Sequence, residues 1–201
     1  MKKLILMAAV MLASAGAYAQ HAVGSFNLQP KIGMNVSNLT DFNDSDPRVG
    51  LAAGIEGEYQ ATDLFSISAG VLYSMQGAKS DFKSSTLNSQ VTATTKLDYI
   101  NIPIMANVYV VKGLAVKLGI QPGFKVNSEI KKDVKTPIGN GAKSTEIEAK
   151  SFDFSLPVGI SYEYANFQLD ARYNFGLTKA FDKGDSKNSV FQITLGYKFD
   201  L

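Results

Sequence analysis

The sequence predicts an all-β fold, an eight-stranded antiparallel up-and-down transmembrane β-barrel, on the basis of three observations. Apolar residues recur at every second position over eight segments of roughly 9 to 15 residues, which is the period of a β-strand. The segments that connect them alternate between short and long. The chain begins with an export signal, and after it no apolar run reaches the ~18 residues that suggest a membrane helix.

The start of the chain has the pattern of a secretory signal peptide. Lys2 and Lys3 precede an apolar run over residues 4–13, and small residues in an A-x-A arrangement end at Ala19. A membrane anchor needs about 20 apolar residues, so this run is too short for one. We expect cleavage after Ala19, with residues 1–19 as the signal peptide and residues 20–201 as one barrel domain.

The composition of the exported part excludes several functions. Of 20 basic and 18 acidic side chains, two lysines belong to the signal, so the remaining chain is formally neutral and nucleic acid is not an expected partner. Cysteine is absent, which rules out disulfides, a thiolate nucleophile and a cysteine-based metal site. We also expect no cofactor.

The first four predicted strands cover residues 28–36, 49–59, 65–75 and 100–110. Their alternating apolar positions are Leu28, Pro30, Ile32, Met34 and Val36; Val49, Leu51, Ala53, Ile55 and Tyr59; Phe65, Ile67, Ala69, Val71, Tyr73 and Met75; and Ile100, Ile102, Ile104, Ala106, Val108 and Val110.

The other four cover residues 114–126, 152–164, 167–177 and 191–199. Their apolar positions are Leu114, Val116, Leu118, Ile120, Phe124 and Val126; Phe152, Phe154, Leu156, Val158, Ile160, Tyr162 and Tyr164; Phe167, Leu169, Ala171, Tyr173, Phe175 and Leu177; and Phe191, Ile193, Leu195, Tyr197 and Phe199.

The connections decide which way the apolar face points. Segments 60–63, 111–113 and 164–166 are tight, whereas 37–48, 77–96, 127–150 and 178–189 are long and polar. A membrane barrel has short periplasmic turns at one end and long extracellular loops at the other, whereas a soluble sandwich or lipocalin-like barrel does not sort its loops in this way. The apolar side chains are therefore expected to face lipid, with the long segments as exposed loops. Aromatic residues at both strand ends fit two interfacial girdles.

Three stretches carry a resemblance to a known family. YINIPIMANVYV (99–110), GIQPGFKV (119–126) and ARYNFGLTKAF (171–181) are similar to motifs of the small outer-membrane β-barrel proteins of Bacteroidetes, the PorT family or outer membrane protein beta-barrel domain. The C-terminal GYKFDL is similar to the aromatic signal read by the barrel-assembly machinery, although it ends in Leu201 rather than Phe. The resemblance implies a cell outer membrane location and assembly by that machinery.

Charged residues at the inward positions form the candidate site. A barrel of eight strands is only wide enough for side chains to fill it, so these charges are expected to pair in a structural network. The members are Lys31, Arg48, Glu56, Glu58, Lys117, Lys125, Asp153, Glu163, Asp170, Arg172 and Lys198. A narrow, gated ion path is the alternative.

Catalysis and metal binding are not expected. The only histidine, His21, lies two residues into the exported chain, where we expect terminal disorder. Glu56 and Glu58 are spaced for a structural role between cations rather than for acid-base chemistry. Segment 41–52 resembles a calcium loop but has Asp46 where glycine is needed and Ala52 where glutamate is needed.

The sequence therefore predicts a non-enzymatic, monomeric barrel with a structural role or a surface-interaction role through its long loops. Outer-membrane lipid surrounds it on this interpretation, and the partner of the loops is open. Two alternatives are a channel for ions or small solutes and, from the resemblance, an accessory component of a type IX secretion system.

Overall fold

The computed structural model describes residues 21–40, 45–84, 89–136, 139–182 and 184–201. These residues form an all-β structure, a single antiparallel sheet of eleven strands. The strands are β1 (Phe26–Leu39), β2 (Asp46–Thr62), β3 (Phe65–Ser84), β4 (Ser89–Asn101), β5 (Ile104–Val111), β6 (Leu114–Thr136), β7 (Gly139–Glu146), β8 (Phe152–Tyr164), β9 (Phe167–Lys179), β10 (Lys187–Tyr197) and β11 (Phe199–Asp200). The predicted signal peptide lies outside the described residues.

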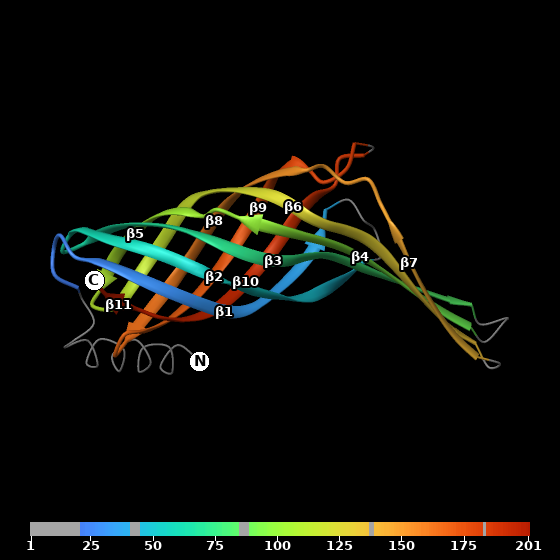
Figure 1. Cartoon of the computed structure of the whole chain (residues 1–201), viewed down its shortest axis with the longest axis horizontal. Helices are drawn as coiled ribbons and strands as arrows, with labels where there is room; N and C mark the ends of the chain where they lie inside the picture. The colour runs from blue at the N-terminus through green and yellow to red at the C-terminus, as the bar shows by residue number, and fades with distance from the viewer. Residues whose placement is uncertain (1–20, 41–44, 85–88, 137–138, 183) are drawn as a thin grey trace, which may run out of the picture.

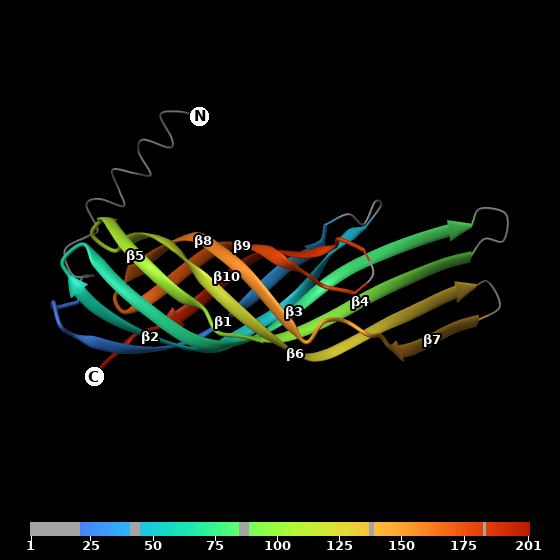
Figure 2. The same cartoon turned by 90° about the horizontal axis from the view of Figure 1, so that it is seen from above.

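The sheet closes on itself. Its strands follow the order β10, β9, β8, β6, β4, β3, β2, β1, and β1 pairs again with β10, for example Ile32 with Leu195. The result is a ring of eight strands that run obliquely to the long axis of the molecule (Figures 1 and 2). Closure matters because an open edge would leave unpaired backbone groups, which are costly in lipid.

Eleven strands arise from eight predicted ones because two of the eight are each divided in two and one further strand, β7, lies in the predicted loop 127–150. β4 and β5 are separated by Ile102 and Pro103, and proline cannot donate to the ladder. The backbone compensates there: Gly70 donates to the Pro103 carbonyl at 3.1 Å and Ile102 donates to Pro122 at 2.8 Å. β10 and β11 are separated by Lys198, while β7 and β8 both pair with β6.

The three short connections are confirmed. They lie at residues 63–64, 112–113 and 165–166, at one end of the ring that we call the turn end. Ala165 and Asn166 have φ of 48° and 68°, the left-handed pair of a type I′ hairpin, and Gly113 has φ of 76°.

Two of the four long segments are not loops, so that part of the prediction was wrong. β3 and β4 stay paired from Leu72 and Asn101 out to Ser84 and Ser89, and β6 continues to Thr136, paired with β7. Together with the β4–β6 pairing, they make a four-stranded extension that we call the β-arm: residues 78–84, 89–96, 127–136 and 139–146. It projects beyond the ring at the end opposite the turns, which we call the arm end (Figures 1 and 2). The strands of the β-arm were missed because they lack the continuous apolar stripe, at every second residue, on which the strand prediction relied.

The polarity of the ring is inverted relative to a soluble protein, as predicted. Ile32, Ile55 and Leu118 on the outside are 62%, 51% and 53% exposed, whereas Asn35, Asp170 and Thr194 inside are fully buried. Among the described residues, helices that are both long and apolar enough to cross a membrane are absent.

Candidate functional site

The lumen is crossed near its middle by a buried group of five charged side chains. Glu56 on β2 lies 3.1 Å from Lys31 Nζ on β1, 3.2 Å from Lys117 Nζ on β6 and 3.3 Å from Arg172 Nη2 on β9. In the ring, β2 lies three strands from β6 in one direction and three strands from β9 in the other, so the pairs of Glu56 with Lys117 and Arg172 span the lumen, whereas Lys31 lies on the neighbouring strand.

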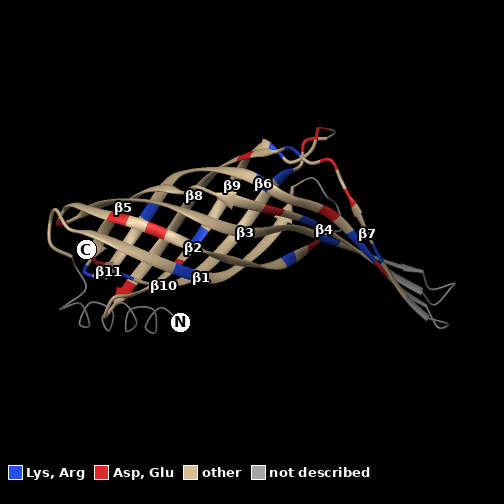
Figure 3. Ribbon diagram, in the orientation of Figure 1, with Lys and Arg blue, Asp and Glu red and all other residues tan. Residues whose placement is uncertain are grey.

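Asp170 on β9 completes this group, the central cluster (Lys31, Glu56, Lys117, Asp170, Arg172). Its carboxylate lies 2.8 Å from Arg172 Nε, 2.9 Å from Lys117 Nζ and 3.6 Å from Lys31 Nζ. Three cations therefore share two carboxylates, and all five side chains are at most 1% exposed. Charged segments lie on neighbouring ring strands in Figure 3.

A second group fills the lumen near the turn end. Lys198, in the gap between β10 and β11, lies 2.9 Å from Glu58 Oε2 and 2.7 Å from Glu163 Oε2. Glu58 Oε1 accepts hydrogen bonds from Tyr109 at 2.5 Å and Ser66 at 2.6 Å. Glu56 and Glu58 thus belong to two different clusters, each with its own cations.

His21 joins this turn-end cluster, so the prediction of a disordered terminal histidine was wrong. Its Nε2 lies 2.9 Å from Glu163 Oε1 and its Nδ1 lies 2.6 Å from Asp200 Oδ1. The hydrogen bond to Glu163 raises the pKa of His21, outweighing burial, which lowers it. The imidazole of His21 thereby links the start of the described chain to Asp200, near its end.

Arg48 pairs with a carboxylate that the sequence did not indicate. Its Nη1 lies 3.3 Å from Asp98 Oδ1 and also donates to the carbonyl of Gln76. Asp98 further accepts hydrogen bonds from Tyr73 at 3.3 Å and Asn127 at 3.2 Å. The period-two pattern places Asp98 in line with the lipid-facing Ile100, but the β4–β6 register shifts between residues 98 and 99, and the carboxylate is buried.

Lys125 and Asp153 differ from the predicted network. Lys125 is half-buried and donates to the carbonyl of Ala149 at 2.5 Å instead of to a carboxylate. Asp153 accepts hydrogen bonds from Asn188 at 3.0 Å and Thr178 at 3.2 Å, and within the described part of the chain no cation lies at ion-pair distance from it. Both residues lie toward the arm end, beyond the central cluster, where a backbone carbonyl of the connection before β8 and polar side chains of β9 and β10 are within reach.

Between these clusters the lumen is lined by amides, several of which have no hydrogen-bond partner among the described protein groups. They are on Asn27, Gln29, Asn101 and Asn174. All four are at most 2% exposed. Such groups are usually satisfied by water when they are buried, so the lumen is polar even where it is not charged.

An apolar cluster lies where the β-arm leaves the ring. It is built from inward side chains of β1, β3 and β4, from the connection between β7 and β8, and from the connection between β9 and β10. Its buried members are Leu39, Ala78, Leu97, Tyr99, Ala149 and Ala180. Ile147 and Phe181 pack against it. The sequence did not indicate this cluster, because its members come from strands and connections that are far apart along the chain.

Comparisons with known proteins show similarity to outer-membrane proteins. In the solved structures, the attachment invasion locus protein Ail of Yersinia pestis, in complex with the heparin analogue sucrose octasulfate, matches with a TM-score of 0.50 and 13% identity over 89% of this chain and 100% of that chain. Neisserial surface protein A matches with a TM-score of 0.46 and 14% identity over 87% and 97%. The curated proteins contain no match.

The sequence profile of the outer membrane protein beta-barrel domain matches residues 18–182, which is most of the chain. That match, with the closed ring and its inverted polarity, places the protein in the outer membrane. The chain belongs to the outer membrane protein beta-barrel domain family.

Proposed function

We propose that this protein is a monomeric outer-membrane barrel whose filled lumen braces its wall and whose β-arm is an extracellular surface for interaction. The eight strands of the ring cross the bilayer, the turn end faces the periplasm and the arm end faces outward. The observation that carries the proposal is the β-arm, a sheet built beyond the ring and connected to it by continuous backbone pairing.

The aromatic residues support the spanning arrangement. Phe167 and Tyr197 have ring centroids 5.0 Å apart near the turn end, and Phe124 and Phe152 have centroids 5.7 Å apart near the arm end. Two aromatic belts, one at each interface, are typical of transmembrane barrels. The exposed aliphatic side chains of the ring lie between them.

The central cluster argues for bracing rather than open conduction. Its ion pairs link four strands across the lumen and occupy the cross-section at that level. Reconstituted protein is expected to show no stable conductance of general-porin size. Long-lived openings comparable with those of a 16-stranded porin would contradict the bracing role.

A narrow ion path remains the second candidate because one observation favours it. The buried amides without protein partners, such as Asn27, Gln29 and Asn174, provide polar groups above and below the central cluster. Small openings that change ion selectivity in an Arg172→Met variant would support this path over a purely structural lumen.

Within its family, we assign the chain to the PorT-type barrels of Bacteroidetes on the motifs quoted above. We expect export with cleavage after Ala19 and insertion by the barrel-assembly machinery through the C-terminal GYKFDL segment. An accessory role in type IX secretion follows only from this resemblance.

Crosslinking in intact cells tests the surface-interaction role. A photo-crosslinker placed at Ser144 on the exposed part of β7 is expected to capture an extracellular partner, and the same group at Lys112 in a turn is the matched control. Capture of a secretion component would favour the accessory role. Identical products at both positions would remove support for a dedicated surface on the β-arm.

A further inference from the structure

A pocket of about 470 Å³ opens beside the β-arm, between the arm and the connection that follows β9. Ile130, Ile147 and Phe181 supply apolar surface, and Ile147 and Phe181 pack on the apolar cluster beneath. The volume lies within the range of ~300 to 1,000 Å³ that is usual for small-molecule sites. The floor of the pocket is backed by the apolar cluster and is suited to an apolar group.

One wall of the pocket is a row of residues on a single face of the β-arm. Ile130 on β6 is paired with Thr95 on β4, which also lines the pocket, and with Thr145 on β7. The next row outward on the same face pairs Lys132 with Lys143. Two residues along a strand correspond to about 7 Å, so both lysines stand at the outer rim of the pocket.

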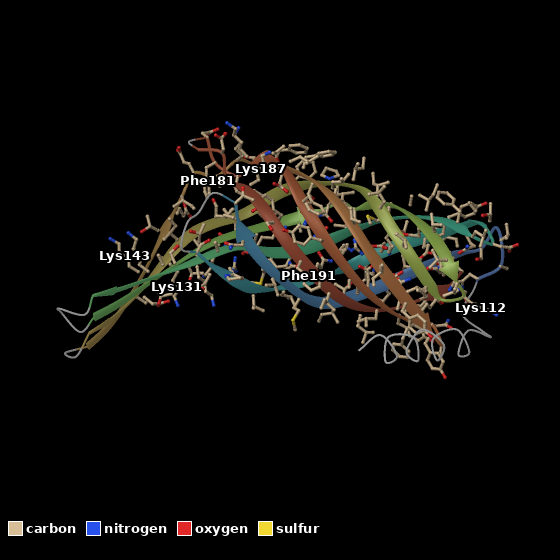
Figure 4. The ribbon with its side chains drawn as sticks, turned by 180° about the vertical axis from the view of Figure 1, so that it is seen from behind. Lys112, Lys131, Lys143, Phe181, Lys187 and Phe191 are labelled. Carbon is tan, nitrogen blue, oxygen red and sulfur yellow. The ribbon has the colours of Figure 1, made fainter. Side chains whose placement is uncertain are left out.

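Lys132 and Lys143 are an unusual cross-strand pair. Like charges directly opposite each other destabilise a sheet, and both side chains are exposed. Among the described residues neither has a carboxylate at ion-pair distance. The acidic side chains on β6 and β7 of the arm, such as Asp133 with its 3.2 Å pair to Lys131, lie on the other face. Figure 4 shows Lys143 and Lys131 on opposite sides of the arm, with Phe181 on the side of Lys143.

The acidic residues of the pocket set the orientation of a ligand. Glu148 and Asp182 line it, and Asp182 is partly offset by Lys150 at 3.7 Å. An anionic group would be repelled from their vicinity and attracted to the two lysines at the rim. A ligand with an apolar tail and a single anionic head would thus place its tail on the floor and its head outside.

We propose that this pocket, together with Lys132 and Lys143, binds a single-chain amphipathic anion, with the alkyl chain over Phe181 and the anionic head between the two lysines. Such a ligand relieves the repulsion between the lysines and covers the exposed apolar floor. The site is independent of the surface-interaction role, because it requires no macromolecular partner.

The chain contains no tryptophan, so a single Phe181→Trp substitution provides a unique fluorophore in the pocket. The reporter protein, reconstituted in nanodiscs of neutral lipid, is titrated with octyl sulfate, octanol and octylamine. A saturable change in indole emission with octyl sulfate, weaker with octanol and weakest with octylamine, is expected. A Phe152→Trp reporter on the lipid face controls for partition of the probes into the bilayer.

Substitutions at the lysines then test the head-group contact in the reporter protein. Lys132→Gln and Lys143→Gln are each expected to weaken octyl sulfate binding roughly three- to tenfold, while octanol binding stays the same. Lys131→Gln, on the opposite face of the same strand, is the matched control and should have no effect. Each variant is first checked for the gel shift on boiling that reports a closed barrel.

Three results would overturn the proposal. Equal affinity for all three probes would mean that the pocket recognises only an alkyl chain or that the probes report partition. Tighter binding of octylamine would assign the head-group contact to Glu148 and not to the lysines. The lack of any saturable response in a correctly folded reporter protein would mean that no such site exists.

Discussion

Neutralising Glu56 is expected to cost more stability than any exposed substitution, because this carboxylate holds three cations together. Its ion pairs to Lys31, Lys117 and Arg172 are 3.1 to 3.3 Å long. At an effective dielectric constant of ~20, one such pair is worth roughly 5 kcal/mol before desolvation is subtracted. Removing one partner of a buried ion pair typically destabilises the folded protein by about 3 to 5 kcal/mol, since the remaining charges stay buried without compensation.

The expected result for Glu56→Gln is therefore a loss of about 3 to 5 kcal/mol in the free energy of unfolding. Urea titration in lipid vesicles measures it, with folded and unfolded protein separated by unboiled gel electrophoresis. Glu146→Gln, on the exposed β7, is the control and should stay within about 0.5 kcal/mol of the parent protein.

A second substitution distinguishes loss of charge balance from loss of packing. Glu56→Gln combined with Lys117→Met restores the original net charge of the central cluster, so the double variant should be at least about 1 kcal/mol more stable than Glu56→Gln alone. A single variant within about 1 kcal/mol of the parent, or a double variant whose loss equals the sum of both single losses, would refute the reasoning.

Three further outcomes are expected. His21→Asn should lower stability at pH 5 and have progressively less effect as the pH rises. The pKa of His21 is raised in the folded protein by its hydrogen bond to a lumenal carboxylate. The contribution of His21 to the free energy of unfolding is therefore complete below the unfolded pKa of ~6.5 and is lost as the pH rises through the folded pKa. Equal effects of this variant at pH 5 and pH 9 would exclude the linkage. A fluorophore on Leu156→Cys should be quenched by a quencher attached to the lipid tails, whereas one on Pro157→Cys should not, because neighbouring strand residues face opposite sides. Quenching at both positions would mean that β8 does not line a closed ring. Gly119→Val should abolish the gel shift on boiling, since a Cβ there would lie 2.1 Å from a backbone carbonyl of β5, while the matched lipid-facing Ala106→Val should retain it.

The sequence alone determined the ring. Period-two alternation in segments such as 152–164 fixes which side chains share a face, and the strict alternation of short and long connections fixes the hairpin order. Both patterns are local along the chain, so they can be recognised without knowledge of the tertiary structure. The same parity predicted that residues such as Glu56, Lys117 and Asp170 share the lumen, and the structure places all three in one cluster.

Which charges meet was decided by the tertiary structure, because parity gives the side of a strand but not the level or the partner across the ring. Asp98 is buried beside Arg48 through a local shift of register, and Asp153 is satisfied by Asn188 and not by a cation. Neither outcome follows from spacing along the chain.

The β-arm shows the same limit most clearly. On the proposed arrangement its strands lie outside the lipid, where no apolar stripe is required. Residues 78–84 and 89–96 accordingly have the composition of a loop although their backbones are paired. Lys132 and Lys143 are likewise unremarkable in the sequence. Only the pairing of β6 with β7 brings them face to face at the rim of a pocket, because that contact depends on the register between two strands and not on either strand alone.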